Sequence, residues 1–323
     1  MKRKVVFTIL AALLPVCLFG QKTIDVTEAG SLPTLISDEE KYTIEELTVT
    51  GELNGTDFAL LRDMAGNNSK GELTEGKLIK LDLRGASIVA GGEKYLDTYE
   101  IALAEGSSFT DSRGMQFETL GNVFPMYSFL GCNSIREIVL PSTVDEVGEY
   151  AFYNGLLTHV EMPSGIRKIG ERAFYGNNHL LDFTMPTSLT SIGANAFTYC
   201  IELTKIELPA SLTDIGKNAF SNCKKIREVW SSIVVPFTIT DKTFAVYDMA
   251  TLYVPEGSEI LYQQTAAWSK FSKIETFDPA TGIASHPIAP VDNDVYSLQG
   301  VRLSRLTPLQ RGVYIVNGEK IVK

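Results

Sequence analysis

Apolar and polar positions repeat along the middle of the chain with a period in the low twenties. Phenylalanine recurs at intervals of 22 to 24 residues, at positions 129, 152, 174, 197, 220 and 244. A period of this length is typical of a solenoid, in which each repeat buries its apolar side against its neighbours. The pattern therefore predicts a stacked-repeat fold over this region.

Each repeat also contains a strand motif that ends in proline. In residues 203–209, apolar Ile206 and Leu208 alternate with charged residues, which predicts a half-buried strand that Pro209 ends. Residues 135–141, 157–163 and 180–186 have the same motif, and weaker versions occupy residues 44–49, 78–83, 226–236 and 249–255. Counting each motif as one turn of the solenoid, here called a rung, gives eight rungs.

A glycine and an Ala-Phe pair follow each strand. After residues 211–215 turn the chain, we expect Gly216 to adopt a backbone conformation that a side chain would hinder, as at Gly148, Gly170 and Gly193. Ala219 and Phe220 then enter the core. The fold class predicted is a leucine-rich-repeat solenoid, mainly β with short turns and helical pieces, with about 22–24 residues per repeat.

Irregular segments flank the repeats and predict caps, because a bare terminal rung would expose apolar surface and a strand edge. Residues 21–76 are expected to form an N-terminal cap with the first repeat-like strand, including a helix that Asp57 begins and Met64 ends. Residues 77–128 are a degenerate repeat with a long insertion, and residues 129–255 are the regular array. In the C-terminal cap, residues 256–278, Ser258 is expected to cap a helix while Trp268 and Phe271 close the core.

The two ends of the chain differ from the array in composition. Residues 1–20 combine three basic residues with a short apolar run, which predicts a signal peptide cleaved after Gly20. Residues 279–292 are a linker by composition. Residues 293–323 alternate as short strands with a hairpin turn at Asn317-Gly318, which predicts a small all-β tail.

Charge narrows the choice of partners. Removal of residues 1–20 takes three basic residues and no acidic one, leaving 26 basic against 39 acidic residues and a net charge of −13. This acidity argues against nucleic acid, whose phosphates require clustered Lys and Arg. No apolar run after residue 20 is long enough to span a membrane.

Three cysteines remain after residue 20, and each follows a repeat phenylalanine by three positions. Cys132, Cys200 and Cys223 thus share one slot, which Gly155 and Asn177 occupy in other rungs. The slot favours small residues, so we interpret the cysteines as reduced core fillers. A Cys200–Cys223 disulfide stays open as an alternative, because adjacent rungs lie about 5 Å apart.

The repeat, best seen in residues 203–223, resembles the BspA-like leucine-rich repeats of bacterial surface proteins. The resemblance covers residues 129–277, and residues 22–90 resemble the N-terminal region of such proteins from Bacteroidales. The tail, with VYSLQG and GVYIVNGEKIVK, resembles the sorting domain of type IX secretion cargo. These resemblances imply secretion or surface display, adhesion to proteins or host surfaces, and contact of residues 293–323 with secretion machinery. They supply no catalytic motif.

The outward-facing strand positions are the candidate binding residues. Alternation predicts that they stack into columns, one residue per rung, on the sheet face that solenoids use for contacts. The candidates are His159, Glu161, Asp182, Thr184, Lys205, Glu207, Glu228, Trp230 and Tyr253. One interpretation is a protein-binding face anchored by Trp230 and Tyr253. The other is a solvated face whose two aromatics pack against the C-terminal cap.

Sites for chemistry are not indicated. No histidine has a nucleophile motif beside it, and no calcium loop, zinc spacing or phosphate loop occurs, so we predict no enzyme, cofactor or metal. Carboxylates on neighbouring rungs, namely Glu161, Asp182 and Glu207, leave a glycan-processing accessory protein as a weaker alternative. We therefore expect a secreted or surface-exposed, adhesin-like binding protein with an extracellular protein or host-surface ligand. A passive envelope scaffold is the other alternative.

Overall fold

The computed structural model describes residues 20–96, 119–181 and 183–278, together with the backbone of seven short strands outside these ranges. Most of the predicted signal peptide, most of the linker at 279–292 and the candidate residue Asp182 lie outside the described residues. The tail is described only as strand backbone. β5 (Ile101–Ala102) and β6 (Ser108–Phe109) form an antiparallel pair within the insertion.

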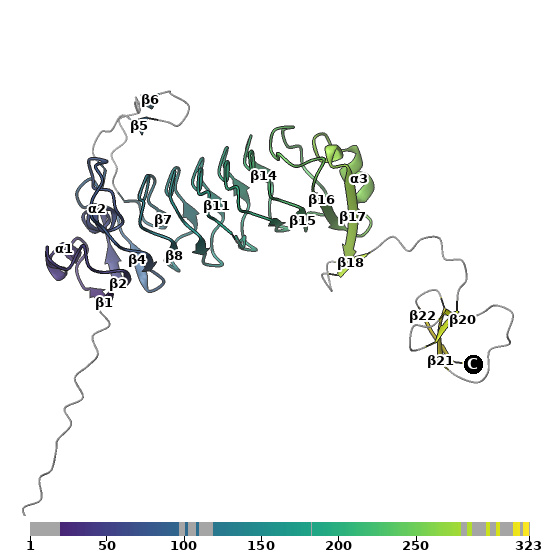
Figure 1. Ribbon diagram of the computed structural model, residues 1–323, viewed down its shortest axis with the longest axis horizontal. Coiled ribbons are helices and arrows are strands. Elements are labelled where there is room, and N and C mark those ends of the chain that lie inside the picture. The colour runs from purple at the N-terminus through teal and green to yellow at the C-terminus, as the bar shows by residue number, and fades with distance from the viewer. Residues whose placement is uncertain are drawn as a thin grey trace, which may run out of the picture.

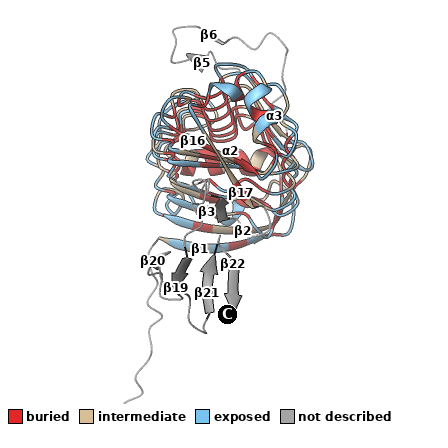
Figure 2. Cartoon of the chain, turned by 90° about the vertical axis from the view of Figure 1, so that its right-hand side faces the viewer, coloured by how far each residue is buried: buried red, intermediate tan, exposed pale blue. Residues whose placement is uncertain are grey.

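Parallel strands stack side by side along the long axis of the molecule (Figure 1). One sheet contains β1 (Gln21–Val26), β2 (Glu46–Leu53), β3 (Lys80–Asp82), β8 (Glu137–Val139) and β10 (His159–Glu161), and β4 (Ala86–Ile88) pairs with the far end of β2. The next contains β13 (Lys205–Leu208), β15 (Glu228–Ser231), β16 (Thr251–Pro255) and β17 (Lys273–Asp278), with β18 (Ile283–Ser285) antiparallel at its edge. Viewed along the stack, buried residues fill the inside of the coil and exposed residues cover the outside (Figure 2).

Between β10 and β13, the segment on the sheet face has the apolar pattern of the neighbouring strands, but its described residues 183–186 pair with no strand. Phe183 and Met185 are buried there, and the Phe183 ring packs edge-on against Phe174 and Phe197, with centroids 5.1 and 4.6 Å away. The core is therefore continuous where the sheet ladder is divided.

The solenoid has ten rungs, so the expected count of eight was wrong. β1 and β17 are the two additional rungs, and they pair in register with β2 and β16. Both lack the complete apolar motif on which the count depended, because Lys22 pairs with Leu47 and Thr276 pairs with Val254. Ile24 and Val26 still face the core from β1, as the alternation of a half-buried strand requires.

A second ladder of short parallel strands runs along another side of the coil, where only turns were expected. It consists of β7 (Val123–Phe124), β9 (Glu146–Val147), β11 (Lys168–Ile169), β12 (Ser191–Ile192) and β14 (Asp214–Ile215). Each of these strands has two residues, and one of the two is buried, for example Ile192 in β12 and Ile215 in β14. The rungs that contain β7, β9, β11, β12 and β14 are thus tied to one another by this ladder as well as through the core.

The repeat phenylalanines stack through the core as predicted. Neighbouring rings from Phe129 to Phe244 have centroids 5.2–5.8 Å apart and interplanar angles of 3–11°. Backbone hydrogen bonds accompany the stack, such as Phe174 N–H to Ala196 O at 2.9 Å and Phe197 N–H to Ala219 O at 2.8 Å. Stacked aromatic pairs contribute about 0.5–1.5 kcal/mol each beyond area burial.

The repeat glycines are required for space, which corrects the expected reason. Gly148, Gly170, Gly193 and Gly216 have no left-handed φ, but a Cβ at each would lie 2.3–2.6 Å from the backbone of the preceding rung. The left-handed residues of these rungs come two positions later. They are Tyr150, Arg172, Asn195 and Asn218, and Tyr127 follows Pro125 in the same way, with φ between 52° and 60° for all five.

The N-terminal cap contains α1 (Leu32–Leu35) and α2 (Gly55–Met64). Helix α2 ends where predicted, but Asn54 is its N-cap and Asp57 completes the capping box by accepting from the Asn54 N–H at 2.8 Å. The Asp57 carboxylate also accepts from the N–H groups of Gly30 and Leu32, at 2.7 and 2.9 Å. Asp57 therefore joins α2 to the segment that follows β1.

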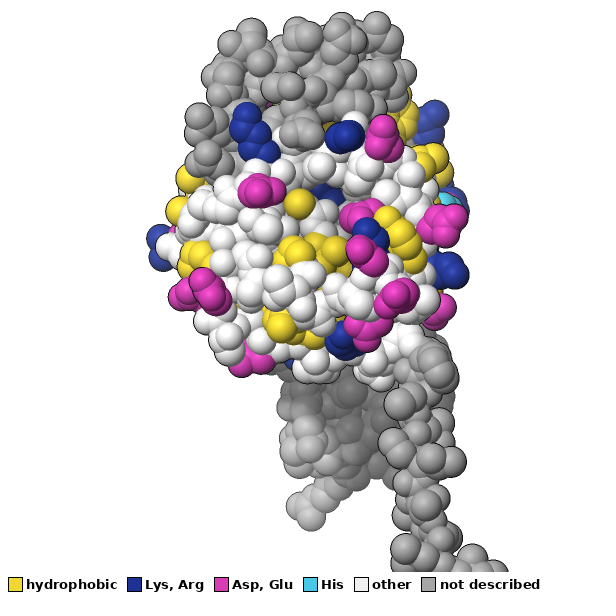
Figure 3. Space-filling model, turned by 90° about the vertical axis from the view of Figure 1, so that its left-hand side faces the viewer, with side chains coloured by type: hydrophobic (Ala, Val, Ile, Leu, Met, Phe, Trp, Pro, Cys, Tyr) yellow, Lys and Arg dark blue, Asp and Glu magenta, His cyan; other side chains and the backbone are white. Residues whose placement is uncertain are grey.

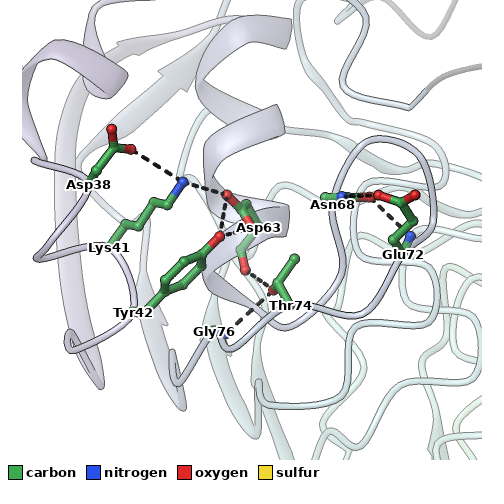
Figure 4. A network of polar contacts seen from close by, with 8 residues as sticks. All are labelled: Asp38, Lys41, Tyr42, Asp63, Asn68, Glu72, Thr74 and Gly76. Carbon is green, nitrogen blue, oxygen red and sulfur yellow. Dashed lines mark hydrogen bonds and ion pairs between the residues drawn. The ribbon is translucent and has the colours of Figure 1, made fainter.

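A second polar network fixes the other end of α2 (Figure 4). Asp63 lies 3.2 Å from the Lys41 ammonium and accepts from the Tyr42 hydroxyl at 3.0 Å. Burial opposes the charge of Lys41, but the hydrogen bond and charge of Asp63 outweigh it and raise the Lys41 pKa. Thr74 donates to the Asp63 carbonyl. Asp63 thus connects the loop before β2 to the segment before β3.

Arg62 connects α2 to the first regular repeat. It is fully buried, and its Nη1 donates to the carbonyls of Tyr127 and Ser128 at 2.9 Å each. Its Nη2 donates to Asn67 Oδ1 at 2.9 Å. Burial lowers the pKa of this guanidinium, which carbonyl oxygens rather than a carboxylate surround.

The C-terminal cap closes the core as expected, with a shorter helix. α3 (Glu259–Gln264) and the 3₁₀ helix η1 (Trp268–Lys270) place Trp268 and Phe271 inside. Ser258 occupies the N-cap position of α3, but its hydroxyl donates to the Pro255 carbonyl at 2.6 Å and does not cap the helix.

The tail contains four antiparallel strands in the order β20-β19-β21-β22. They are β19 (Val295–Ser297), β20 (Arg302–Leu303), β21 (Val313–Val316) and β22 (Glu319–Val322). Val316 pairs with Glu319, and the turn predicted at Asn317-Gly318 lies outside the described residues. Among the described helices, none combines the length and apolar character needed to span a bilayer.

Candidate functional site

Strand register places the candidate residues of the sheet face in two columns, as alternation predicted. In one column Glu137 pairs with His159, and Lys205, Glu228 and Thr251 follow one another. In the other, Val139 pairs with Glu161, and Glu207, Trp230 and Tyr253 follow one another. Residue Asp182 lies outside the described residues, and Thr184 is exposed in the rung without strand pairing.

The sheet face extends toward the N-terminus through residues that were not among the candidates. Lys80 pairs in register with Glu137, and its ammonium lies 3.4 Å from the Glu137 carboxylate. Arg84 lies 3.1 Å from Glu161 and 3.7 Å from Asp82. Charges on this face therefore neutralise one another in pairs, and such exposed pairs contribute about 0–1 kcal/mol to stability. At the N-terminal end of the solenoid, acidic and basic side chains are likewise interspersed (Figure 3).

Aromatic residues gather at the C-terminal end of the sheet face. Trp230 stacks on Tyr253 with centroids 4.1 Å apart, and Lys205 lies over the Trp230 ring with its Nζ 5.1 Å from the centroid. The indole N–H donates to Glu228 at 2.9 Å. Trp230 and Tyr253 are both half-buried, so part of each ring is open to solvent.

The C-terminal cap supports this cluster through a residue that sequence reasoning missed. Phe277 of β17 packs edge-on against Trp230, with centroids 5.3 Å apart. Phe277 lies two residues after Glu275, which pairs with Tyr253, so Phe277 and Glu275 lie on the same face of the strand. Burial, followed by the charge of Glu275, raises the pKa of Tyr253. Adding one rung after β16 to the repeat count would have identified Phe277.

The described carboxylates considered for glycan processing each have a basic neighbour. Glu161 lies beside Arg84, and Glu207 forms an ion pair with Lys205. His159 and His179 are exposed on separate segments. In the described ranges, no three His, Cys, Asp or Glu residues are placed to hold a metal ion.

The shared cysteine slot has a hydrogen-bonding role that size alone did not indicate. Asn177 donates to the carbonyls of Phe152 and Phe174 at 2.8 and 2.9 Å, and its Oδ1 accepts from Leu157 N–H at 3.2 Å. The thiols of Cys200 and Cys223 lie 3.2 and 3.0 Å from the carbonyls of Phe174 and Phe197. Both thiols are free and buried, so this slot supplies donors to the preceding rung.

Comparison with protein families identifies the repeats. Residues 115–227 match the model described as a BspA type leucine rich repeat region, in six copies. This part of the chain is similar to BspA-type leucine-rich-repeat regions. The match covers the rungs with the Ala-Phe pair, while the rest of the chain lies outside it. No curated protein matches the chain.

Several solved structures are similar to this chain. A leucine-rich-repeat protein from T. pallidum is 25% identical over 48% of this chain and 63% of its own, with a TM-score of 0.34. A leucine-rich-repeat protein from Bacteroides ovatus is 19% identical over 50% of this chain and 60% of its own, with a TM-score of 0.32. The pneumococcal vaccine antigen PcpA is 15% identical over 72% of this chain and 67% of its own, with a TM-score of 0.38. The chain thus spans about three fifths of the first two proteins.

Proposed function

We propose that this protein is a secreted or surface-exposed binding module that contacts an extracellular protein through its sheet face. The observation that carries the proposal is the half-exposed cluster of Lys205, Trp230 and Tyr253, on three parallel strands that pair in register. A rigid surface of this kind loses little conformational freedom on binding, and Trp and Tyr are enriched among the residues that dominate interfaces.

Secretion and non-catalytic action are parts of the same proposal. The basic and apolar segments of residues 1–20 support export, and residues 293–323 would contact the sorting machinery. BspA-type repeats support a binding role. Cleavage of the tail from exported protein, detected by mass spectrometry, would favour a sorting role for it.

The test is binding of purified residues 21–323 to a panel of host matrix proteins and mucins. A variant with Trp230→Ala and Tyr253→Ala should lose at least about 30-fold in affinity, because anchors of this kind contribute about 2 kcal/mol or more. Tyr199→Ala is the matched control, since Tyr199 is 40% exposed and follows a core phenylalanine rather than lying on the sheet face. Absence of binding across the panel, or binding that both variants retain, would reject the proposal.

A passive envelope scaffold is the second candidate. It is favoured by the ion pairs within the sheet face, such as Lys80–Glu137 and Arg84–Glu161, which leave fewer free charges for a partner. Under this alternative, the double aromatic variant would fold and localise normally while the panel shows no binding.

A further inference from the structure

A hollow opens on the turn side of the coil because one column of side chains becomes smaller along the stack. The left-handed residue two positions after each repeat glycine is Tyr150, then Arg172, then Asn195 and Asn218. Tyr153 and Tyr175, which follow the stacked phenylalanines, give way to Thr198 and Ser221 in the next two rungs. Large side chains thus fill the early rungs, and small ones leave space in the later rungs.

The hollow has a volume of about 280 Å³. Its wall toward the N-terminus is formed by Arg172 and the stacked rings of Tyr153 and Tyr175, whose centroids lie 4.8 Å apart. Lys217 and Asn218 line it from the rung of β14. These residues come after β9, β11, β12 and β14, so the hollow does not belong to the columns of the sheet face.

Two cations line this hollow in a protein whose overall net charge is −10. Nη1 of Arg172 donates to the Tyr150 hydroxyl at 2.7 Å, which fixes the guanidinium, and Glu171 is the acidic neighbour, 3.8 Å from Nε. Lys217 is exposed and forms no ion pair within the described ranges. A cationic lining supplied by a fixed guanidinium and an unpaired ammonium suits a carboxylate.

Amide groups add hydrogen-bonding capacity beside the cations. Asn218 Nδ2 donates to Asn195 Oδ1 at 3.3 Å. This contact uses one donor of Asn218 and the acceptor of Asn195. The Nδ2 of Asn195 and the Oδ1 of Asn218 have no hydrogen-bond partner among the described residues. A free amide donor and a free amide acceptor together suit hydroxyl groups, which both accept and donate.

We propose that this hollow binds a single acidic sugar residue, with its carboxylate near Arg172 and Lys217 and its hydroxyls near Asn195 and Asn218. The volume lies just below the range of small-molecule pockets, which begins at about 300 Å³, so it accommodates one ring rather than an extended chain. The edges of Tyr153 and Tyr175 provide an apolar wall for the ring. This site is separate from the sheet face and does not depend on the protein-binding role proposed for it.

The test uses residues 21–323 with two acidic probes, the methyl glycosides of N-acetylneuraminic acid and glucuronic acid. Methyl glucoside serves as the neutral probe, and a tetra-aspartate peptide as the acidic non-sugar probe. Saturation-transfer and titration NMR should show millimolar binding of at least one acidic sugar, and at least tenfold weaker binding of the neutral sugar and the peptide.

Two variants locate the site. Lys217→Glu should weaken binding at least tenfold by reversing one charge. Asn195→Tyr should abolish binding by filling the hollow, and the fold should tolerate it because Tyr150 occupies the equivalent position at a φ of 54°, against 57° for Asn195. Trp230→Ala should leave sugar binding unchanged.

Each contrary result would overturn a defined part of the proposal. Absence of acidic-sugar binding by the folded protein would overturn it entirely, and binding that survives both Lys217→Glu and Asn195→Tyr would overturn the location. Equal binding of methyl glucoside would overturn the role of the cations. Preferential binding of the aspartate peptide would overturn the assignment to a sugar.

Discussion

At the residue scale, the fold depends on a few positions where the backbone of one rung approaches the next. The repeat glycines allow this approach, and the left-handed residues two positions later reverse the chain. Tyr127, Tyr150 and Arg172 adopt left-handed φ despite their size, which is an unfavourable backbone state for such residues. Their packing compensates, as in the stacking of Tyr127 on Tyr150 at 4.8 Å.

Substitution of Gly193 by alanine should destabilise the protein. The new Cβ would lie 2.5 Å from Glu171 N and 2.6 Å from Gly170 C, which are backbone atoms of the preceding rung. Overpacking of this kind costs about 1–3 kcal/mol, and urea unfolding followed by circular dichroism would measure the loss. Gly165→Ala is the matched control, because its Cβ would meet nothing closer than 3.8 Å. Equal stability of the two variants would contradict the close-approach argument.

The buried thiols should make stability fall at alkaline pH. Burial raises the pKa of Cys132 to about 11 and that of Cys223 to about 12, and it raises the pKa of Cys200 as well. Unfolded thiols ionise from about pH 9, so above this pH the unfolded state holds fewer protons and the free energy of unfolding decreases. Each thiol contributes up to about 1.4 kcal/mol per pH unit.

Urea unfolding at pH 8, 9 and 10 tests this dependence. The decrease should be smaller in Cys223→Ala, which lacks one titrating thiol, although the variant starts from lower stability. Buried tyrosines such as Tyr95 and Tyr262 also have raised pKa values, so the comparison is confined to pH 10 and below. An identical pH slope in the wild type and the variant would count against a contribution from Cys223.

At the element scale, the unit of structure is a rung joined to its neighbours by strand ladders and a core stack. The slot three residues after the repeat phenylalanine adds a further link, because its side chain donates to a carbonyl of the preceding rung. Asn177 makes three hydrogen bonds, one of them to the Phe152 carbonyl of the preceding rung, whereas Cys200 makes one. Asn177 therefore satisfies more buried backbone groups than Cys200.

Asn177→Ala should accordingly cost more stability than Cys200→Ala. Truncation of Asn177 leaves the buried N–H of Leu157 without its partner, at about 1–3 kcal/mol, and removes one of the donors to each of the Phe152 and Phe174 carbonyls. Truncation of Cys200 removes one weak donor and a small volume. Thermal unfolding of both variants would measure the order, and a larger loss for Cys200→Ala would contradict it.

Much of the element structure follows from local patterning. The core phenylalanines, the alternating strands and both columns of the sheet face were predicted, because period-2 and period-23 patterns record which side chains are buried. The terminal rungs β1 and β17 were missed because Lys22 and Thr276 interrupt the apolar motif, and Phe277 of the aromatic cluster was missed with them. The reason for Gly216 and the donor role of Asn177 depend on backbone atoms of a neighbouring rung, whose distances no local pattern records.

At the scale of the whole molecule, stability is a sum over neighbouring rungs and two caps. A rung contacts mainly the rungs beside it, so its removal as a complete repeat should leave a shorter but intact solenoid. Sequence alone also did not predict the hollow on the turn side, since it arises from the order of large and small side chains across four rungs. The hollow can be inferred from that order only when it is known which residues of neighbouring rungs lie side by side.

Deletion of residues 180–202, one complete repeat, should give a folded protein shorter by about 4.8 Å. Leu203 would replace Leu180, and Phe220 would stack on Phe174 in place of Phe197. Circular dichroism and small-angle scattering would measure the fold and length. Deletion of residues 180–191, half a repeat, is the control and should prevent folding, because it brings unlike positions together. Equal folding of both deletions would refute the rung-by-rung description.

The phenylalanine stack also creates an ambiguity that the folding chain must resolve. Six nearly equivalent phenylalanine rings can stack correctly even when a segment docks one repeat out of place. The core alone therefore does not determine which repeats become neighbours. The order of the repeats is determined instead by the column of residues with left-handed φ, which along the stack are Tyr127, Tyr150, Arg172, Asn195 and Asn218. Only the native alignment sets Tyr127 on Tyr150 and brings Arg172 to the Tyr150 hydroxyl. The residues that differ from one repeat to the next are therefore the ones that set the order in which the repeats stack.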